Sequence, residues 1–214
     1  MGEFLDIVDD KGIEALDFVI DKITESKYFA GFPIISQALG VIKAVRVIPN
    51  YLYAKKTCAF LDGLKSDNMD YDTFSKAMKD LNQNSKKFEE ELLFLIEKAE
   101  NIEKANLLGY FTRLFALRCI SYEDYIFYTN VINNIQMNFL KLLSDNYKNN
   151  DYINNSPIYG ILQSQGFSEN GSGFRMQEGT LHLGFVFSDK LTFFGEYLNN
   201  YFKEYSFKRD SENI

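Results

Sequence analysis

The chain has 214 residues, of which 46% are hydrophobic and 25% charged, and its 23 basic and 30 acidic side chains give a net charge of −7. These proportions exclude an intrinsically disordered chain, and three prolines with thirteen glycines exclude a collagen-like or low-complexity one. Because the acidic balance disfavours nucleic-acid binding through phosphate neutralisation, we expect a globular, mainly α-helical protein of one or two domains.

The first predicted helical segment covers residues 3–27. Its apolar side chains recur at intervals of three and four, which places them on one helical face; they are Leu5, Val8, Leu16, Val19, Ile20 and Ile23. Eight acidic residues against three lysines make the outer face acidic. The first ten residues contain no basic side chain and therefore predict neither a secretory nor a mitochondrial signal, so we expect a cytoplasmic protein.

The most unusual segment is residues 29–54. Residues 29–42 carry no charge, and every charged residue that follows, up to Lys56, is basic. Pro33 is placed to open a helix, and Pro49 to end or kink it. The uncharged run is shorter than the roughly 20 residues that span a bilayer. Three interpretations are open: a central core helix of a bundle, a helix on an anionic membrane surface, or a buried interface with a partner or a second copy.

The candidate contact residues for a partner protein or an anionic membrane combine apolar residues of this segment with basic residues that follow. They are Phe32, Ile35, Leu39, Ile42, Lys43, Arg46, Lys55 and Lys56. The acidic face of residues 3–27 is complementary in charge to the basic residues. It either attracts them within one monomer or covers the apolar segment until a trigger releases it.

Four further helices are predicted over residues 72–82, 85–99, 102–119 and 121–147. Their starts and stops are short and polar, which is typical of neighbouring helices in a bundle. Ser121 and Asp124 have the spacing of a capping box at the start of the last of these helices.

The tyrosines near residue 125 and the two cysteines are expected to be packing residues. Tyr122, Tyr125 and Tyr128 follow a three-residue spacing, which predicts an amphipathic stripe with the hydroxyls at its rim, or a contact with a partner. Cys58 and Cys119 each lie in an apolar stretch and form no CxxC motif. We therefore expect both to be reduced core cysteines of a cytosolic protein.

The last sixty residues have a different pattern. Ser156-Pro157 opens a short predicted helix over residues 158–165, which Gly166 closes. A glycine-rich turn at residues 170–173 precedes a strict alternation of residue types over 181–187, which predicts a strand. A last helix follows, with Thr192 as its candidate cap.

This ending resembles the C-terminal part of winged-helix modules. The resemblance covers residues 156–205 and depends on the short helix ending in Gln-Gly-Phe, the Gly/Ser turn, the strand and the phrase Leu-Thr-x-x-Gly at Leu191–Gly195. It implies a β-hairpin wing followed by a helix. In DNA-reading members a recognition helix carries basic and amide side chains. Residues 158–165 contain no Lys or Arg, which disfavours nucleic-acid binding here.

The helical remainder is similar to uncharacterised helical proteins of low-GC bacteria and their phages. The likeness lies in a Phe-Pro segment at Phe32-Pro33 followed by Lys55-Lys56 and Phe60-Leu61. An excess of Lys over Arg and many Asn residues are typical of the AT-rich genomes of such organisms. The resemblance implies a bacterial or phage source and no particular activity.

Few residues of the chain could carry chemistry. His182 is its single histidine, and the two cysteines are far apart in the sequence. A catalytic triad with a histidine base or a zinc site needs more of these residues. The sequence contains neither GxxxxGK[ST] nor a strand followed by GxGxxG, the loops that cradle phosphates. We therefore expect no catalytic, cofactor or metal site.

These patterns together predict a mainly α fold: a multi-helix bundle over residues 1–148, a small winged-helix-like helix, β-hairpin and helix unit over 151–207, and a polar tail over 208–214. The predicted function is a non-catalytic protein-interaction module of a bacterial or phage-derived immunity or defence system, which binds another protein or itself. One alternative is a membrane-acting protein that inserts residues 29–54. The other is a winged-helix transcription regulator.

Overall fold

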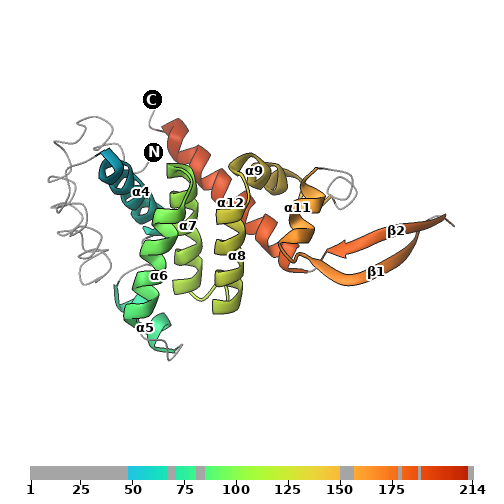
Figure 1. Cartoon of the computed structure of the whole chain (residues 1–214), viewed down its shortest axis with the longest axis horizontal. Helices are drawn as coiled ribbons and strands as arrows, with labels where there is room; N and C mark the ends of the chain where they lie inside the picture. Colours follow the sequence, from blue (N-terminus) through green and yellow to red (C-terminus); the bar gives the residue numbers. More distant parts are fainter. Residues whose placement is uncertain are drawn as a thin grey trace. The chain divides into compact units, whose positions relative to one another are not determined.

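The structure is a computed structural model that describes residues 48–66, 71–80, 85–149, 157–177, 180–187 and 189–211. The elements of this part are α4 (Ile48–Leu64), α5 (Tyr71–Asp80), α6 (Ser85–Lys98), α7 (Ile102–Ala116), α8 (Tyr122–Asn134), α9 (Met137–Asn146), α11 (Ile158–Ser164), β1 (Ser168–Gln177), β2 (Thr180–Phe187) and α12 (Asp189–Ser211) (Figure 1). The predicted mainly helical character is confirmed. The chain divides into two compact units, Met1–Asn133 and Asn134–Ile214.

Helix α7 is the central helix of the first unit. Its residues are buried on every side, including the polar Lys104, Thr112 and Arg113. Helices α4, α5 and α6 pack against it. A helix that is apolar on most of its circumference must be enclosed by other elements. One interpretation of the sequence predicts that residues 29–54 form the central helix; residues 29–47 lie outside the described residues.

Helices α4 and α7 cross at two glycines that face one another. A Cβ atom on Gly63 would collide with the backbone carbonyl of Asn106, and one on Gly109 with that of Phe60. The Asn106 side chain adds a hydrogen bond across the crossing, from Nδ2 to the Ala59 carbonyl oxygen at 2.9 Å. The backbones therefore touch at a distance that only glycine permits.

Aromatic rings fill the core around α7. The Phe88 ring lies 5.8 Å from both Phe115 and Tyr125, and Phe115 stacks on Tyr125 at 5.1 Å. Phe111 meets Tyr128 edge to face at 5.7 Å. Tyr125 and Tyr128 are thus fully enclosed. The expected rim position of the tyrosine stripe is wrong for these two residues, because the stripe faces α7.

Helix α7 ends at Ala116, three residues before its predicted end. Arg118 has a positive φ of 60°, the Cys119 N–H donates to the Leu114 carbonyl at 2.8 Å, and the Arg118 N–H to the Phe115 carbonyl at 2.9 Å. This pattern closes a helix with a left-handed residue, usually glycine. Cys119 lies in the turn that results and is exposed, so its predicted core position is wrong, whereas Cys58 is buried as expected.

The helix predicted over residues 121–147 is two helices, α8 and α9. Ser121 caps α8: its hydroxyl accepts from the Asp124 N–H at 3.1 Å and donates to the Asp124 carboxylate at 2.8 Å. The chain leaves the helical path at Gln136, which is extended. Ile135 and Met137 are both buried. Residues two apart point to different sides of one helix, so a break lets both reach the core.

The second unit joins α9, α11 and α12. Phe167 stacks on Phe194 at 5.5 Å, and Asn199 Nδ2 donates to the Ser144 carbonyl at 3.1 Å. A Cβ on Gly195 would collide with the Tyr147 side chain, so glycine is required where α12 meets α9. Helix α12 begins at Asp189 and includes Thr192, the residue expected to cap it.

The ends of α11 and the two strands complete this unit. Gly166 closes α11 with a φ of 84°, as predicted, and the Phe167 N–H donates to the Leu162 carbonyl at 3.1 Å. Strands β1 and β2 pair antiparallel, with Phe174 opposite Leu183 and an irregularity between Ser168 and Ser172.

Candidate functional site

Among the described residues of the first unit, Lys104 is the most deeply buried charged residue. Its side chain is 2% exposed, although lysine is almost never fully buried unless it is paired. Asn101 places it: the Asn101 side chain caps α7 and accepts from the Lys104 N–H at 2.8 Å. The cap fixes the first turn of α7 and with it the direction in which the lysine leaves the helix.

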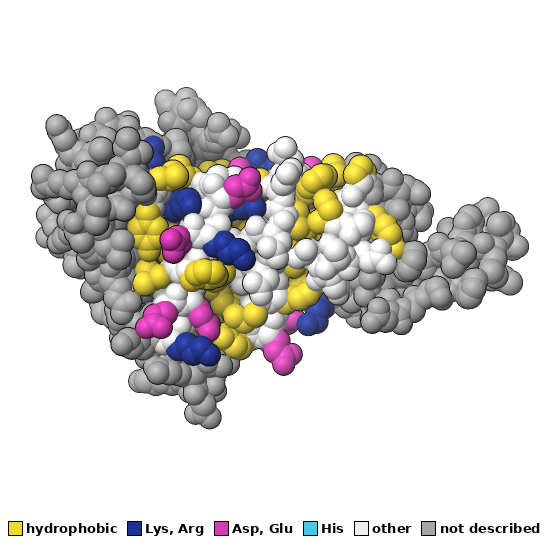
Figure 2. All heavy atoms as spheres, in the orientation of Figure 1, with side chains coloured by type: hydrophobic (Ala, Val, Ile, Leu, Met, Phe, Trp, Pro, Cys, Tyr) yellow, Lys and Arg dark blue, Asp and Glu magenta, His cyan; other side chains and the backbone are white. Residues whose placement is uncertain are grey.

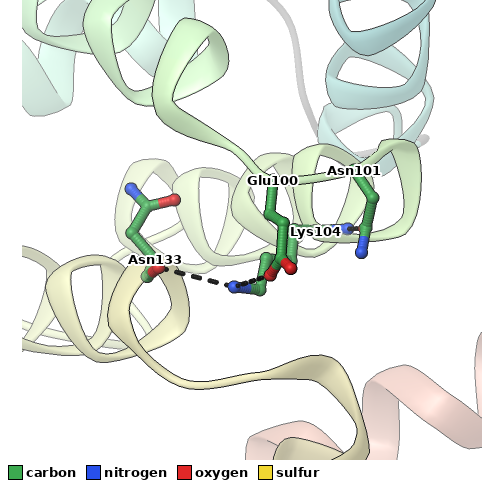
Figure 3. A network of polar contacts seen from close by, with 4 residues as sticks. All are labelled: Glu100, Asn101, Lys104 and Asn133. Atoms are coloured by element: carbon green, nitrogen blue, oxygen red, sulfur yellow. Dashed lines mark hydrogen bonds and ion pairs between the residues drawn. The ribbon is translucent and has the colours of Figure 1, made fainter.

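The Lys104 ammonium joins two helix ends (Figure 3). Its Nζ lies 2.9 Å from Glu100 Oε2 and donates to the backbone carbonyl of Asn133 at 3.4 Å. Glu100 immediately precedes the cap of α7, and Asn133 is in the last turn of α8. The Glu100 side chain is 62% exposed, so the buried cation has a solvated counter-ion.

Helix dipoles favour this arrangement. A carboxylate is stabilised near the positive N-terminal end of a helix, and a cation near the negative C-terminal end. Glu100 occupies the first position, beside α7, and Lys104 the second, beside α8. An ammonium can only donate hydrogen bonds, so the cluster is suited to hold helix ends together.

The side-chain amide of Asn133 lies beside this cluster but takes no part in it. It points away from the ammonium (Figure 3). Both its Nδ2 and Oδ1 atoms are buried, and no atom of the described residues forms a hydrogen bond with either. A buried amide without partners is uncommon in native proteins and calls for an explanation.

Two tyrosine hydroxyls form a second polar feature of the core. The Tyr125 hydroxyl lies 3.2 Å from Thr112 Oγ1, and the Tyr122 hydroxyl donates to Glu91 Oε2 at 3.4 Å. Burial raises the pKa of both hydroxyls above the usual value, and the nearby Glu91 charge raises that of Tyr122 further. Both groups therefore stay protonated and act as hydrogen-bonding side chains.

The structure describes two of the predicted contact residues. Lys55 and Lys56 lie side by side in α4 and are half-buried. Lys56 Nζ donates to the Glu97 carbonyl at the end of α6, at 3.1 Å. The other six predicted contacts, Phe32, Ile35, Leu39, Ile42, Lys43 and Arg46, lie outside the described residues.

Three large apolar side chains stand out on the described surface. Phe94 is 60% exposed, Phe193 53% and Leu52 48%. On the face drawn in Figure 2, hydrophobic side chains lie between intermixed acidic and basic ones over the first unit. The Lys98 ammonium lies 5.9 Å from the centre of the Phe94 ring, within reach of a cation–π contact.

Within the described ranges, no three His, Cys, Asp or Glu side chains gather in a group that could hold a metal ion. Among the same residues, no helix combines the length and apolar character needed to cross a bilayer.

No protein-family model, curated protein or solved structure matches the chain. The candidate sites therefore stand on their own geometry: the Lys104 cluster, the Asn133 amide and the exposed Phe94.

Proposed function

We propose that the chain is a non-catalytic module that binds another protein, in a bacterial or phage-derived system of the immunity or defence type. The observation that carries this proposal is Phe94. Its ring is 60% exposed although it lies in the middle of a regular helix, α6. Burying the exposed part of such a ring against a partner contributes on the order of 3 kcal/mol to binding.

The surroundings of Phe94 suit a specific contact. The exposed residues of α6 among the described side chains are Lys87, Glu90, Phe94, Glu97 and Lys98. Their spacing places the Phe94 ring on one helical face, in a stripe of acidic and basic side chains. Aromatic anchors that become buried at an interface are typical of the residues that dominate binding energy. The charges around the ring would select a partner of complementary pattern and orient it.

The basic residues of α4 extend this surface. Lys56 reaches the Glu97 carbonyl, one turn of α6 beyond Phe94. Lys56, one of the predicted contact residues, thus lies next to the end of the stripe. The proposed binding surface consists of Phe94, Lys98, Lys55 and Lys56.

The test compares two exposed phenylalanines. The full chain, tagged and expressed in its native host, is captured with and without Phe94→Ala, and Phe193→Ala serves as a matched control in the second unit. We expect Phe94→Ala to weaken partner capture at least tenfold and Phe193→Ala to leave it unchanged. Melting temperatures should be similar, because exposed side chains contribute little to stability. A wild-type chain that elutes alone, as a monomer, would overturn the proposal.

We also propose that residues 157–211 form a winged-helix-like unit. The order α11, β1, β2 and α12 supports this, because it is the order of elements at the end of winged-helix modules. Helix α11 carries no Lys or Arg, so we expect this unit not to read DNA. Retardation of duplex DNA in a gel at about 50 mM salt, lost steeply as salt rises, would contradict that expectation.

A further inference from the structure

Three exposed side chains of α6 form one row on the surface of the first unit. Glu90, Phe94 and Lys98 are all exposed and follow one another at intervals of four residues. Side chains at this interval lie one above the other, in a row that runs obliquely along the helix. We call this row the α6 ridge. Its centre is an aromatic ring, with a carboxylate one turn before it and an ammonium one turn after it.

The charge of the α6 ridge reverses from one end to the other. Glu90 and Lys98 lie at equal distances in sequence from Phe94, one on each side. The ridge is therefore complementary to a copy of itself that runs in the opposite direction. In that pairing the two Phe94 rings meet, and Glu90 of each chain lies beside Lys98 of the partner subunit. A two-fold axis generates both ionic contacts, as in an isologous dimer.

The geometry of helix packing permits this pairing. Rows of residues four apart are inclined by about 26° to the helix axis, so two helices whose rows lie side by side cross at about 50°, the commonest packing class in globular proteins. The Lys98 ammonium lies 5.9 Å from the centre of the Phe94 ring. The cation is thus already at the edge of the aromatic contact, where a carboxylate of a second chain can pair with it.

We propose that the occupant of the surface around Phe94 is a second copy of the chain, bound antiparallel through the α6 ridge in a symmetric dimer. This inference rests on the proposed function, because it assigns a partner to the surface proposed there. The pair of rings provides the apolar contact that dominates binding. The two pairs of Glu90 with Lys98 set its direction, since a parallel copy would place like charges beside each other.

The test measures the oligomeric state of the purified full chain by sedimentation velocity, with no other protein present. Glu90→Lys makes both ends of the α6 ridge positive, and Lys98→Glu makes both ends negative. Either change sets like charges against each other twice in one dimer, so each should weaken the dimer by more than about tenfold. Glu123→Lys is the matched control, because it makes the same charge change at an exposed position of α8.

A mixture of the two charge variants gives the decisive measurement. In a mixed dimer every contact along the α6 ridge again joins opposite charges, so the mixture should restore the dimer that each variant alone has lost. We expect the wild type and Glu123→Lys to be dimers and Phe94→Ala to be a monomer at the same concentration. Circular dichroism should show the same helical content for all of these proteins, because the changed side chains are exposed.

Three results would overturn the inference: a wild-type chain that is monomeric up to about 100 μM, a dimer that survives Phe94→Ala, or a mixture of the charge variants that stays monomeric. The capture experiment in the native host separates this failure from that of the proposed function. A chain that is monomeric when purified, yet captures a different protein through Phe94, refutes the second copy and leaves the proposed function standing. A monomer that captures nothing refutes both.

Discussion

The glycine crossing of α4 and α7 allows the sharpest prediction about stability. Gly109→Ala adds one carbon atom, and this atom would collide with the Phe60 carbonyl and lie 3.0 Å from the Leu64 nitrogen. Both obstacles are backbone atoms of a helix, so no side-chain rotation can relieve the collision. The helices must separate, on the order of 1 Å, over the whole crossing.

The size of the effect follows from two opposing contributions. A gap of about 0.5–1 Å forfeits a quarter to a half of the dispersion attraction of each contact across it. Overpacking of this kind costs about 1–3 kcal/mol, and a backbone collision belongs at the upper end. Alanine regains up to about 1 kcal/mol of helix propensity. The net loss is about 2 kcal/mol or more, which lowers the melting temperature by roughly 4–8 °C.

Circular dichroism at increasing temperature or urea measures this loss. Gly160→Ala is the control, since Gly160 is exposed in α11 and an added Cβ would meet nothing within 4 Å. That variant should be stabilised by about 0.5–1 kcal/mol. If Gly109→Ala is as stable as Gly160→Ala, the close approach of α4 and α7 does not exist and the reasoning fails.

Three further predictions test other parts of the first unit. Ser121→Ala removes the cap of α8 and should cost about 1 kcal/mol in urea denaturation; an unchanged midpoint would count against the cap. Burial raises the pKa of Tyr125 above its ordinary value of 10.0, so the folded protein retains a proton that the unfolded chain loses. The free energy of unfolding should not change through this group below pH 10 and should fall above pH 10. The fall should be less steep for Tyr125→Phe, and identical alkaline profiles of the two proteins would refute this. A thiol reagent should label Cys119 in the native protein but Cys58 only after unfolding, because burial raises the pKa of the Cys58 thiol, and equal rates would contradict the burial difference.

Helix boundaries were predictable from the sequence where a local signal exists. Ser121 and Asp124 form the predicted cap, and Gly166 ends α11 with a positive φ. The end of α7 has no such signal, because Arg118 takes the conformation that glycine usually takes. The break before α9 contains neither glycine nor proline; it follows from the burial of both Ile135 and Met137, which only the packed structure reveals.

The candidate sites also contain parts that a local sequence signal predicts and parts that only the packed structure reveals. Glu100, Asn101 and Lys104 have the spacing of a capped helix start with an ion pair, so this half of the cluster could have been found in the sequence. The carbonyl that receives the ammonium belongs to Asn133, 29 residues further along the chain. No local pattern encodes such a partner. The exposed Phe94 was also missed, although the helical spacing places it in the stripe of Glu90 and Glu97 and not on the buried face of α6.

The glycine crossing also has a consequence for the order of folding. The Asn106 amide and the Ala59 carbonyl that it binds are 47 residues apart, so the contact forms only after a long loop has closed. Closing such a loop costs entropy before any of the contact energy is returned, and distant pairings slow folding. Helix α4 should therefore dock late, onto an α7 that already contacts its neighbours in sequence, and the backbone around Gly109 stays uncovered in a newly synthesised chain until then.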